Sequence, residues 1–522
     1  MPMKMMKTLK MMKLVAGMAV VAVADGVFAA GNAANPDALT LEPIPYPVEA
    51  KIDMDAPVAF DAATTITLDC PDGAAAKWLA DHFGAWYGAF APKVVAGKAG
   101  LQLRDGDEAY ALKADVQGVA VAARTLAGVR WAAYTLRQLA FAKRGTMKTA
   151  GYLLPTCAIS DSPRLKFRGV HLCWFPETRV EQVERAIRLA ALMKFNYVVL
   201  EPWGMFKSER HPWWSWPDAK MTKDEMRRLV AVGRDLGVTL VPQVAAFGHA
   251  GASRSVSSKH SVLDLRPEYE PLYEPGGWNW CLTNPATQRV LRDLIDEMLD
   301  VFGHPPFIHL GCDEAQPPTC PDCRKRPYGE LVSEHIAGLA AFAKERGARA
   351  MMWHDMLFEQ GDPRWAGFIV SGSKETAKMM DTLPRDVVIC DWQYSGGTNL
   401  VARGWPTMRH IKEKGFAVVG CPFENYDAME SMSATLAEIG GDGILLTTWH
   451  HLRKWEWKNI YRHGAAAAWG TPSRPGGYGG FPQCDTIFDR ALRMVGHDMK
   501  VRSYRDTGNV DSQIPPSWWL DN

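Results

Sequence analysis

The chain has 522 residues, with 59 lysines and arginines against 58 aspartates and glutamates. This balance excludes a strongly basic surface for nucleic acid or anionic lipid, and a hydrophobic content of 47% excludes a disordered chain. The length exceeds one compact core of ordinary size, so we expect one large domain with a smaller companion.

The first 29 residues have the pattern of an export signal. Four lysines lie within the first 13 residues and precede an apolar run from Leu14 to Ala24. This run has signal-peptide length and is too short to span a bilayer. Val27 and Ala29 fit a small-x-small cleavage site. We therefore expect a signal peptide over 1–29 and an exported protein, periplasmic or secreted, without a stable membrane anchor.

Residues 36–155 mix short apolar runs with two amphipathic helical stretches, at 74–88 and 126–142. The mixture predicts a small α+β companion domain. The segment 155–166 contains two prolines and is interpreted as the linker to the next domain.

Residues 160–470 alternate apolar, strand-like runs with helical segments. Near-continuous apolar strands are typical of a parallel sheet buried on both faces. Eight runs with intervening helical segments predict an α/β fold, a (β/α)8 TIM barrel. Residues 471–522 begin with a stretch rich in glycine and proline and are interpreted as an extension that caps the barrel. The eight runs are 168–174, 196–201, 238–244, 307–311, 349–355, 387–392, 417–421 and 443–449.

Polar and aromatic residues gather where the predicted strands end. In this fold the functional residues lie at the carboxyl ends of the strands and in the loops that follow. An arrangement without function would scatter such residues evenly. The residues at the strand ends are Trp174, Glu201, Trp203, Gln243, His249, Asp313, Glu314, Trp353, Asp355, Asp391, Trp392, Trp449 and His450.

Two adjacent acids, Asp313 and Glu314, end the apolar run "FIHLG". Where the chain bends at a strand end, both side chains can reach one cavity, and buried like charges raise at least one pKa. A raised pKa suits a general acid that must hold its proton near neutral pH. Most glycosidases place two carboxylates ~5–10 Å apart on either side of the bond. Adjacent acids fit better a scheme in which a 2-acetamido group of the substrate is the nucleophile.

Three segments resemble the β-N-acetylhexosaminidases of glycoside hydrolase family 20: "ISDSPRLKFRGVHL", "MTKDEMRRLVAVGRDLGVTLVPQVAAFGHA" and "LTNPATQRVLRDLIDEMLDVFGHPPFIHLGCDE". The resemblance covers about 160–450, and the upstream domain resembles the family's companion domain. It implies a retaining, exo-acting enzyme that removes terminal β-linked GlcNAc or GalNAc from glycans or glycoconjugates, without a cofactor or a catalytic metal.

The resemblance also implies roles for single residues. Glu314 would be the general acid/base, and Asp313 would orient the 2-acetamido group. Arg168 would bind sugar hydroxyls, and His249 would lie near the acids. Tyr426 would donate a hydrogen bond to the acetamido carbonyl.

Three tryptophans, Trp353, Trp392 and Trp449, match the aromatic walls of the family's pocket. Five more, in the loops 211–218 and 276–280, either line outer sugar subsites or pack loops on the rim, and packing is favoured for most of them. They are Trp213, Trp214, Trp216, Trp278 and Trp280.

The chain departs from the family pattern at several places. Cys312 replaces the usual glycine, and "TTWHHLRKWEW" lacks the family's Trp-x-Glu. "GCDE" and "WHDML" resemble the hexosaminidase D branch, and the resemblance implies that Asp355 of "WHDML" binds the substrate. Glu201 is either a replacement sugar contact or an ion-pair partner at the rim.

Two alternatives stay open: a non-catalytic sugar-binding protein on a hexosaminidase scaffold, and a glycosidase for another β-linked sugar. The pair Cys320 and Cys323 forms a single C-x-x-C, whereas a structural zinc site usually has four ligands. A disulfide or a free pair fits this motif at least as well as a metal does. The sequence does not indicate an oligomeric state.

Overall fold

The computed structural model describes residues 43–143, 151–174, 178–217, 219–250, 262–394, 398–423, 425–449, 459–471, 491 and 494–495. The predicted signal peptide at 1–29 and nearly all of the predicted extension at 471–522 lie outside these ranges.

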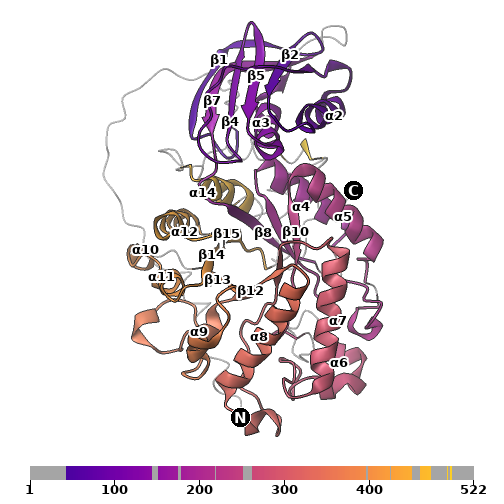
Figure 1. Ribbon diagram of the computed structural model, residues 1–522, viewed down its shortest axis with the longest axis vertical. Helices are drawn as coiled ribbons and strands as arrows, with labels where there is room; N and C mark the ends of the chain where they lie inside the picture. The colour runs from indigo at the N-terminus through magenta and orange to yellow at the C-terminus, as the bar shows by residue number, and fades with distance from the viewer. Residues whose placement is uncertain are drawn as a thin grey trace, which may run out of the picture. The chain divides into compact units, whose positions relative to one another are not determined.

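The first domain is a mixed sheet with two helices, as the sequence predicts (Figure 1). Its strands follow the order β1-β7-β4-β5-β2-β3, and β6 pairs with β7. Helices α2 and α3 pack on this sheet and on each other. The elements are β1 (Glu49–Phe60), β2 (Thr65–Asp69), α2 (Ala75–Tyr87), β3 (Lys93–Ala96), β4 (Tyr110–Asp115), β5 (Gly118–Ala123), α3 (Leu126–Leu139), β6 (Phe141–Ala142) and β7 (Tyr152–Asp161).

The second domain is a parallel barrel of eight strands, one for each apolar run in the sequence, so the barrel prediction is confirmed. All seven consecutive strand pairs in the order β10-β9-β8-β15-β14-β13-β12-β11 are parallel. A parallel bridge between Gln243 and His309 joins the ends of this order and closes the barrel. The strands are β8 (Phe167–Cys173), β9 (Tyr197–Glu201), β10 (Thr239–Pro242), β11 (Phe307–His309), β12 (Arg349–Trp353), β13 (Val388–Gln393), β14 (Ala417–Pro422) and β15 (Gly443–Leu446).

Helices surround these strands (Figure 1). The α-helices are α4 (Val180–Leu192), α5 (Lys223–Leu236), α6 (Val262–Leu265), α7 (Pro285–Val301), α8 (Tyr328–Glu345), α9 (Met379–Thr382), α10 (Thr398–Ala402), α11 (Pro406–Glu413), α12 (Tyr426–Ile439) and α14 (Ala465–Trp469). The 3₁₀-helices are η1 (Gly88–Phe90), η2 (Pro212–Trp214), η3 (Pro267–Leu272), η4 (Cys323–Lys325), η5 (Asp355–Leu357), η6 (Pro363–Trp365) and η7 (Thr376–Lys378), and η8 (Asn459–Gly464) is a π-helix.

Local sequence signals explain where the helices next to the rim begin and end. Thr222 and Glu225 form a reciprocal capping box at the start of α5, and Gly237 ends that helix with a φ of 85°. Asn284 caps α7, whose first residue is a proline. These caps satisfy backbone groups that a helix leaves without partners, so the helix ends are placed by side chains next to the rim.

The two domains meet around the buried carboxylate of Asp161, the last residue of β7. It accepts hydrogen bonds from Tyr110 Oη at 2.7 Å, Lys194 Nζ at 3.0 Å and Trp469 Nε1 at 2.8 Å. Asp161 lies within the segment interpreted as a linker, and this interpretation is wrong for 155–161. These residues belong to β7, which pairs with β1 and β4, so the boundary follows Asp161.

Candidate active site

The acid pair lies on a strained bend after β11. Cys312 and Glu314 have left-handed backbone conformations, with φ of 73° and 48°. Such a conformation costs a residue with a side chain roughly 1–3 kcal/mol and persists where the surroundings impose it. A neighbouring loop does so here, since a Cβ added to Gly248 would lie only 2.0 Å from the Asp313 carbonyl oxygen. The glycine of "FGHA" therefore allows this loop to press against the bend.

His249 joins the two acids. Its Nε2 lies 3.4 Å from Asp313 Oδ2 and 3.2 Å from Glu314 Oε2. Burial alone would lower the pKa of His249, but the charges of Asp313, Glu314 and Glu201 raise the pKa to about 9. The imidazole is therefore protonated at neutral pH and holds both carboxylates on one side of the site.

Asp313 and Glu314 differ in exposure. Asp313 is buried, whereas the side chain of Glu314 is 50% exposed. Burial raises the pKa of Asp313 above its usual range; His249 opposes this shift, while Asp355 and Glu201 reinforce it. One carboxyl group thus lies at the base of the site and the other at its mouth.

Asp355 supports the acids from behind. Its Oδ2 accepts a hydrogen bond from the Glu314 N–H at 2.9 Å and another from the Ser371 hydroxyl. Its Oδ1 accepts one from Trp392 Nε1 at 3.3 Å. Asp355 is fully buried, so we assign it a positioning role rather than the direct sugar contact that the sequence suggests.

Aromatic residues from three strand ends gather beside the acids. The ring of Trp449 lies 5.1 Å from that of Trp353 and 6.3 Å from that of Trp392. Tyr394 is not among the residues expected from the sequence. Its ring lies 5.1 Å from the ring of Trp392. Burial and the nearby charge of Asp313 raise the pKa of Tyr394. Trp353 is fully buried on the ring of His309 at 4.2 Å and forms the floor of this aromatic group.

Glu201 lies inside the barrel next to this floor. Its Oε2 is 3.3 Å from His171 Nε2 and 3.7 Å from Cys173 Sγ. These three residues could hold a metal ion, and they form one of two such groups within the described ranges. Several neighbouring strand-end side chains have buried polar atoms that make no hydrogen bond to any described residue: His171 Nδ1, Gln243 Oε1, His309 Nε2 and Trp353 Nε1. The interior beneath the acids therefore keeps unused hydrogen-bonding capacity.

A family model, "Glycosyl hydrolase family 20, catalytic domain", matches residues 179–464, more than half of the chain. The chain belongs to glycosyl hydrolase family 20. A second model, "Glycosyl hydrolase family 20, domain 2", matches 40–162, which is the sheet domain that precedes the barrel. The resemblance carried by the acid pair and its neighbours is thus confirmed at the level of the family.

Curated relatives are identical to this family 20 chain at about a quarter of the aligned residues. A beta-hexosaminidase of Vibrio furnissii is 26% identical over 397 residues, 68% of this chain and 60% of the relative. A beta-N-acetylhexosaminidase of Cellulomonas fimi is 26% identical over 344 residues, 60% of this chain and 66% of the relative. The chain therefore spans less than two thirds of the length of these relatives.

Solved structures of family 20 share the fold. An exo beta-N-acetylglucosaminidase of Vibrio harveyi, solved with N-acetylglucosamine, aligns with a TM-score of 0.64 at 17% identity, covering 87% of this chain and 77% of that one. An N-acetyl-beta-hexosaminidase of Streptomyces plicatus aligns with a TM-score of 0.61 at 18% identity, covering 89% of this chain and 95% of that one.

Arg168 does not reach the family 20 site, and its expected sugar contact is corrected. Arg168 lies near the start of β8. The two acids follow the carboxyl end of β11, which lies at the opposite edge of the barrel. The guanidinium of Arg168 is buried at the domain boundary, 2.5 Å from Glu108 Oε2, and donates to the carbonyl of Lys194 at 3.1 Å and of Leu165 at 2.8 Å. Its donors are therefore engaged in joining the two domains.

Tyr426 is also corrected as the tyrosine of the site. It begins α12, is 42% exposed, and its ring lies 3.9 Å from the ring of His463. Tyr394, directly after β13, is the tyrosine whose pKa responds to Asp313. The strand-end rule that selected Trp392 would have selected Tyr394 if it had been extended by two residues.

Most of the outer tryptophans pack loops, as the sequence analysis favoured. Trp214 and Trp280 are buried, and Trp213 stacks on Tyr269 at 3.9 Å. Trp278 differs, because its ring lies 4.3 Å from that of His249 and its Nε1 donates to the Glu314 carbonyl at 2.9 Å.

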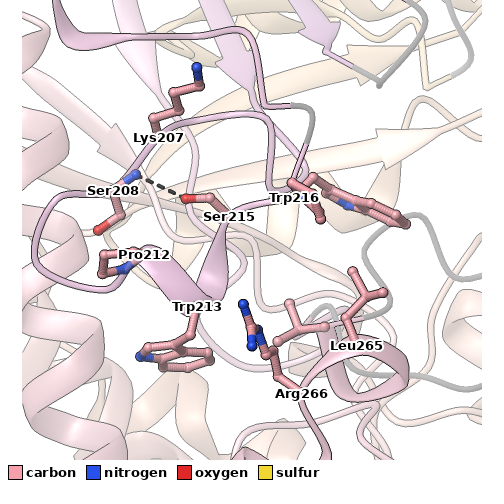
Figure 2. A pocket seen from close by; sticks show the side chains of 10 residues that line it. Lys207, Ser208, Pro212, Trp213, Ser215, Trp216, Leu265 and Arg266 are labelled. Atoms are coloured by element: carbon pink, nitrogen blue, oxygen red, sulfur yellow. Dashed lines mark hydrogen bonds between the residues drawn. The ribbon is translucent and has the colours of Figure 1, made fainter.

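Figure 2 shows a separate pocket between the loop after β9 and the end of α6. Trp213, Trp216, Leu265 and Arg266 line it, and its described lining does not include the acid pair. We assign this pocket no part in the chemistry.

Proposed function

We propose that the protein is an exo-acting retaining β-N-acetylhexosaminidase that removes terminal β-linked GlcNAc or GalNAc by substrate-assisted catalysis. The observation that carries the proposal is the contact of two adjacent carboxylates, Asp313 and Glu314, with the single imidazole of His249. An ordinary retaining glycosidase needs its nucleophile ~5–5.5 Å from the acid, across the bond. Asp355 is not suited to that role, because its oxygens already accept three hydrogen bonds.

In the first step, Glu314 at the mouth donates its proton to the glycosidic oxygen. The acetamido carbonyl oxygen of the bound sugar attacks C1, the bond from C1 to the glycosidic oxygen breaks, and the alcohol leaves. Asp313 accepts a hydrogen bond from the acetamido N–H and stabilises the positive charge of the oxazolinium intermediate. That charge favours the ionised form of Asp313 and so counteracts its raised pKa. Tyr394 donates to the acetamido oxygen.

In the second step, the Glu314 carboxylate takes a proton from water. The water oxygen attacks C1 from the side that the alcohol left, and the bond between C1 and the acetamido oxygen breaks. The acetamido group is restored, Glu314 is protonated again, and the configuration at C1 is retained.

The relatives support this proposal through the activities in their names, beta-hexosaminidase and beta-N-acetylhexosaminidase. The terminal position of the cleaved sugar is supported by the exo-acting Vibrio harveyi enzyme, which has the same fold. The substrate partner would be a glycan or glycoconjugate with a terminal N-acetylhexosamine. We extend the proposal to membership of the hexosaminidase D branch, which "GCDE" and "WHDML" support.

A panel of aryl β-glycosides tests the function. GlcNAc or GalNAc derivatives should be cleaved, and the corresponding glucoside and galactoside should not, because they lack the 2-acetamido nucleophile. An N-acetylglucosamine-thiazoline should inhibit tightly, since it mimics the intermediate. Efficient cleavage of the plain glucoside would favour another sugar specificity. Saturable binding of GlcNAc without any turnover would favour the sugar-binding alternative, which the departure from Trp-x-Glu supports.

We further propose that the protein is exported, periplasmic or secreted. The lysines and the apolar run before Ala29 support a cleaved signal. Amino-terminal sequencing of the exported protein should begin at residue 30. The described part of the chain contains no helix that is long and apolar enough to cross a membrane.

A further inference from the structure

Four potential metal ligands meet where the segment 274–281 approaches the loop that follows the acid pair. They are Glu274, Cys281, Cys320 and Cys323. One ligand atom from each lies within 4.8 Å of the others. Cys281 Sγ is 3.8 Å from Cys320 Sγ and 3.8 Å from Cys323 Sγ. The sequence has only one C-x-x-C, which supplies two ligands. A carboxylate and a cysteine from a distant segment supply the other two.

The spacing of the sulfurs is that of a tetrahedral metal–thiolate centre. Two sulfurs bound ~2.3 Å from a tetrahedral zinc ion lie about 3.8 Å apart. A disulfide requires about 2.05 Å, and any one disulfide among three cysteines leaves the third without a partner. The observed distances therefore favour a shared metal over a covalent pair.

The surroundings complete the ligand set. Glu274 Oε2 accepts hydrogen bonds from the N–H groups of Thr319 and Cys320, both at 2.7 Å. Its buried Oε1 makes no hydrogen bond of acceptable geometry to a described residue. The Cys323 N–H lies 3.2 Å from Cys320 Sγ, an outer contact that stabilises a thiolate ligand. One carboxylate oxygen is thus fixed in place, and the other is left for a cation.

We propose that Glu274, Cys281, Cys320 and Cys323 form a structural zinc site that joins two loops behind Glu314. Three thiolates and one carboxylate fill the four positions that zinc prefers, so the site is closed and takes no part in the reaction. On binding, each thiol releases its proton to solvent, and the sulfur donates an electron pair to the ion.

The site would fix the loop that carries the acid pair. A bridge between Tyr273 and Trp280 closes a turn; Glu274 is the first residue inside it, and Cys281 directly follows it. Inside that turn, Asn279 Nδ2 donates to the Gln316 carbonyl at 2.6 Å. Trp278 in the same turn holds the Glu314 carbonyl. A cation that binds this turn to Cys320 and Cys323 would therefore restrict the backbone from Glu314 to Cys320, directly after the acid pair.

Elemental analysis of the purified full-length protein after dialysis against metal-free buffer is the direct test. We expect one zinc ion per chain, reduced at least tenfold in Cys320→Ser and in Cys281→Ser. Cys70→Ser is the matched control, because Cys70 is a half-exposed cysteine of the first domain, and it should keep the zinc. Wild-type protein without bound zinc, or non-reduced peptide mapping that finds two of the three cysteines in a disulfide, would overturn the proposal.

Cobalt provides a second measurement that needs no variant. Protein refolded or exchanged with Co²⁺ should show thiolate-to-cobalt charge-transfer absorption and the intense visible bands of tetrahedral cobalt. Octahedral spectra, or spectra without charge transfer, would contradict the ligand set. Glu314→Gln should retain the zinc, so the metal site and the proposed catalysis can fail separately.

Discussion

Two buried aspartates at different places in the molecule have opposite electrostatic surroundings. Asp161 lies at the domain boundary, where burial would raise its pKa, but Lys194, Trp469, the Val48 N–H and Tyr110 together hold the pKa below its usual range. Asp313 lies at the carboxyl edge of the barrel, where burial and acidic neighbours outweigh His249 and raise the pKa.

The difference shows how the same residue type serves structure at one place and chemistry at the other. At the boundary, hydrogen bonds and a cation satisfy the carboxylate, so the loss of one partner would leave an unpaired charge buried between the two domains. At the rim, several acids compete for one histidine, and a proton can be held or released at low cost. Substitutions at the two places should therefore separate stability from activity.

The largest effect is expected at the rim, from Glu314→Gln. The amide can neither protonate the glycosidic oxygen nor take a proton from water, so kcat on an aryl β-GlcNAc or β-GalNAc substrate should fall about 10²–10⁴-fold. The thermal midpoint should fall only slightly, because the side chain is 50% exposed and His249 keeps its contact with Asp313. Glu345→Gln, at the exposed end of α8, is the matched control. Near-normal turnover by Glu314→Gln would exclude Glu314 as the acid.

Lys194→Met should have the reverse effect. Lys194 and Asp161 both have fully buried side chains, 3.0 Å apart, so this change leaves a buried carboxylate without its cation. We expect a loss of about 3–5 kcal/mol in the free energy of unfolding, measured with urea at pH 7. The kcat per folded molecule should stay the same.

Lys77→Met is the control for that change, because it removes an exposed ion pair with Asp81 and should cost less than about 1 kcal/mol. If Lys194→Met and Lys77→Met lowered the free energy of unfolding equally, the buried ion pair at the domain boundary would be no more important for stability than an exposed one.

The pH dependence of stability should show whether His249 is protonated in the folded protein. Its pKa rises from an ordinary 6.5 to about 9 on folding, so the folded protein binds the proton more tightly. The resulting stabilisation, of order 3 kcal/mol, is fully present below pH 6.5 and is lost as the pH rises through 9. The difference in thermal midpoint between wild type and His249→Gln should shrink over that interval. A difference independent of pH would mean that His249 is not charged in the folded protein.

The sequence predicts the framework of the site better than its details. Eight apolar runs identify the barrel strands, because parallel strands are buried on both faces and their composition reports this directly. The acid pair and His249 follow from motifs next to those strands. The expectation for Arg168 is wrong because the motif match takes no account of its position at the start of the run 168–174, at the edge of the barrel opposite the strand ends. Its partner Glu108 is 60 residues away in another domain.

The zinc ligands show the same limitation. Cys320 and Cys323 are visible as a motif, but Glu274 and Cys281 belong to a separate loop and carry no spacing signal of their own. Only the fold brings the two loops together, so the sequence alone leaves a disulfide, a metal and a free pair open. Contacts between residues far apart in the chain therefore cannot be predicted from the spacing of a motif.

The smallest expected effect compares two tyrosines. Tyr394→Phe removes a hydroxyl group beside Asp313 and should lower kcat about 10–100-fold, as expected for the loss of one hydrogen bond to a charged group, worth about 1.5–3 kcal/mol. Tyr426→Phe should leave kcat unchanged, because Tyr426 is 42% exposed at the start of α12. Both changes keep the ring, so packing is matched. If Tyr426→Phe lost more activity than Tyr394→Phe, the hydrogen bond to the acetamido oxygen would have to be reassigned to the loop after β14.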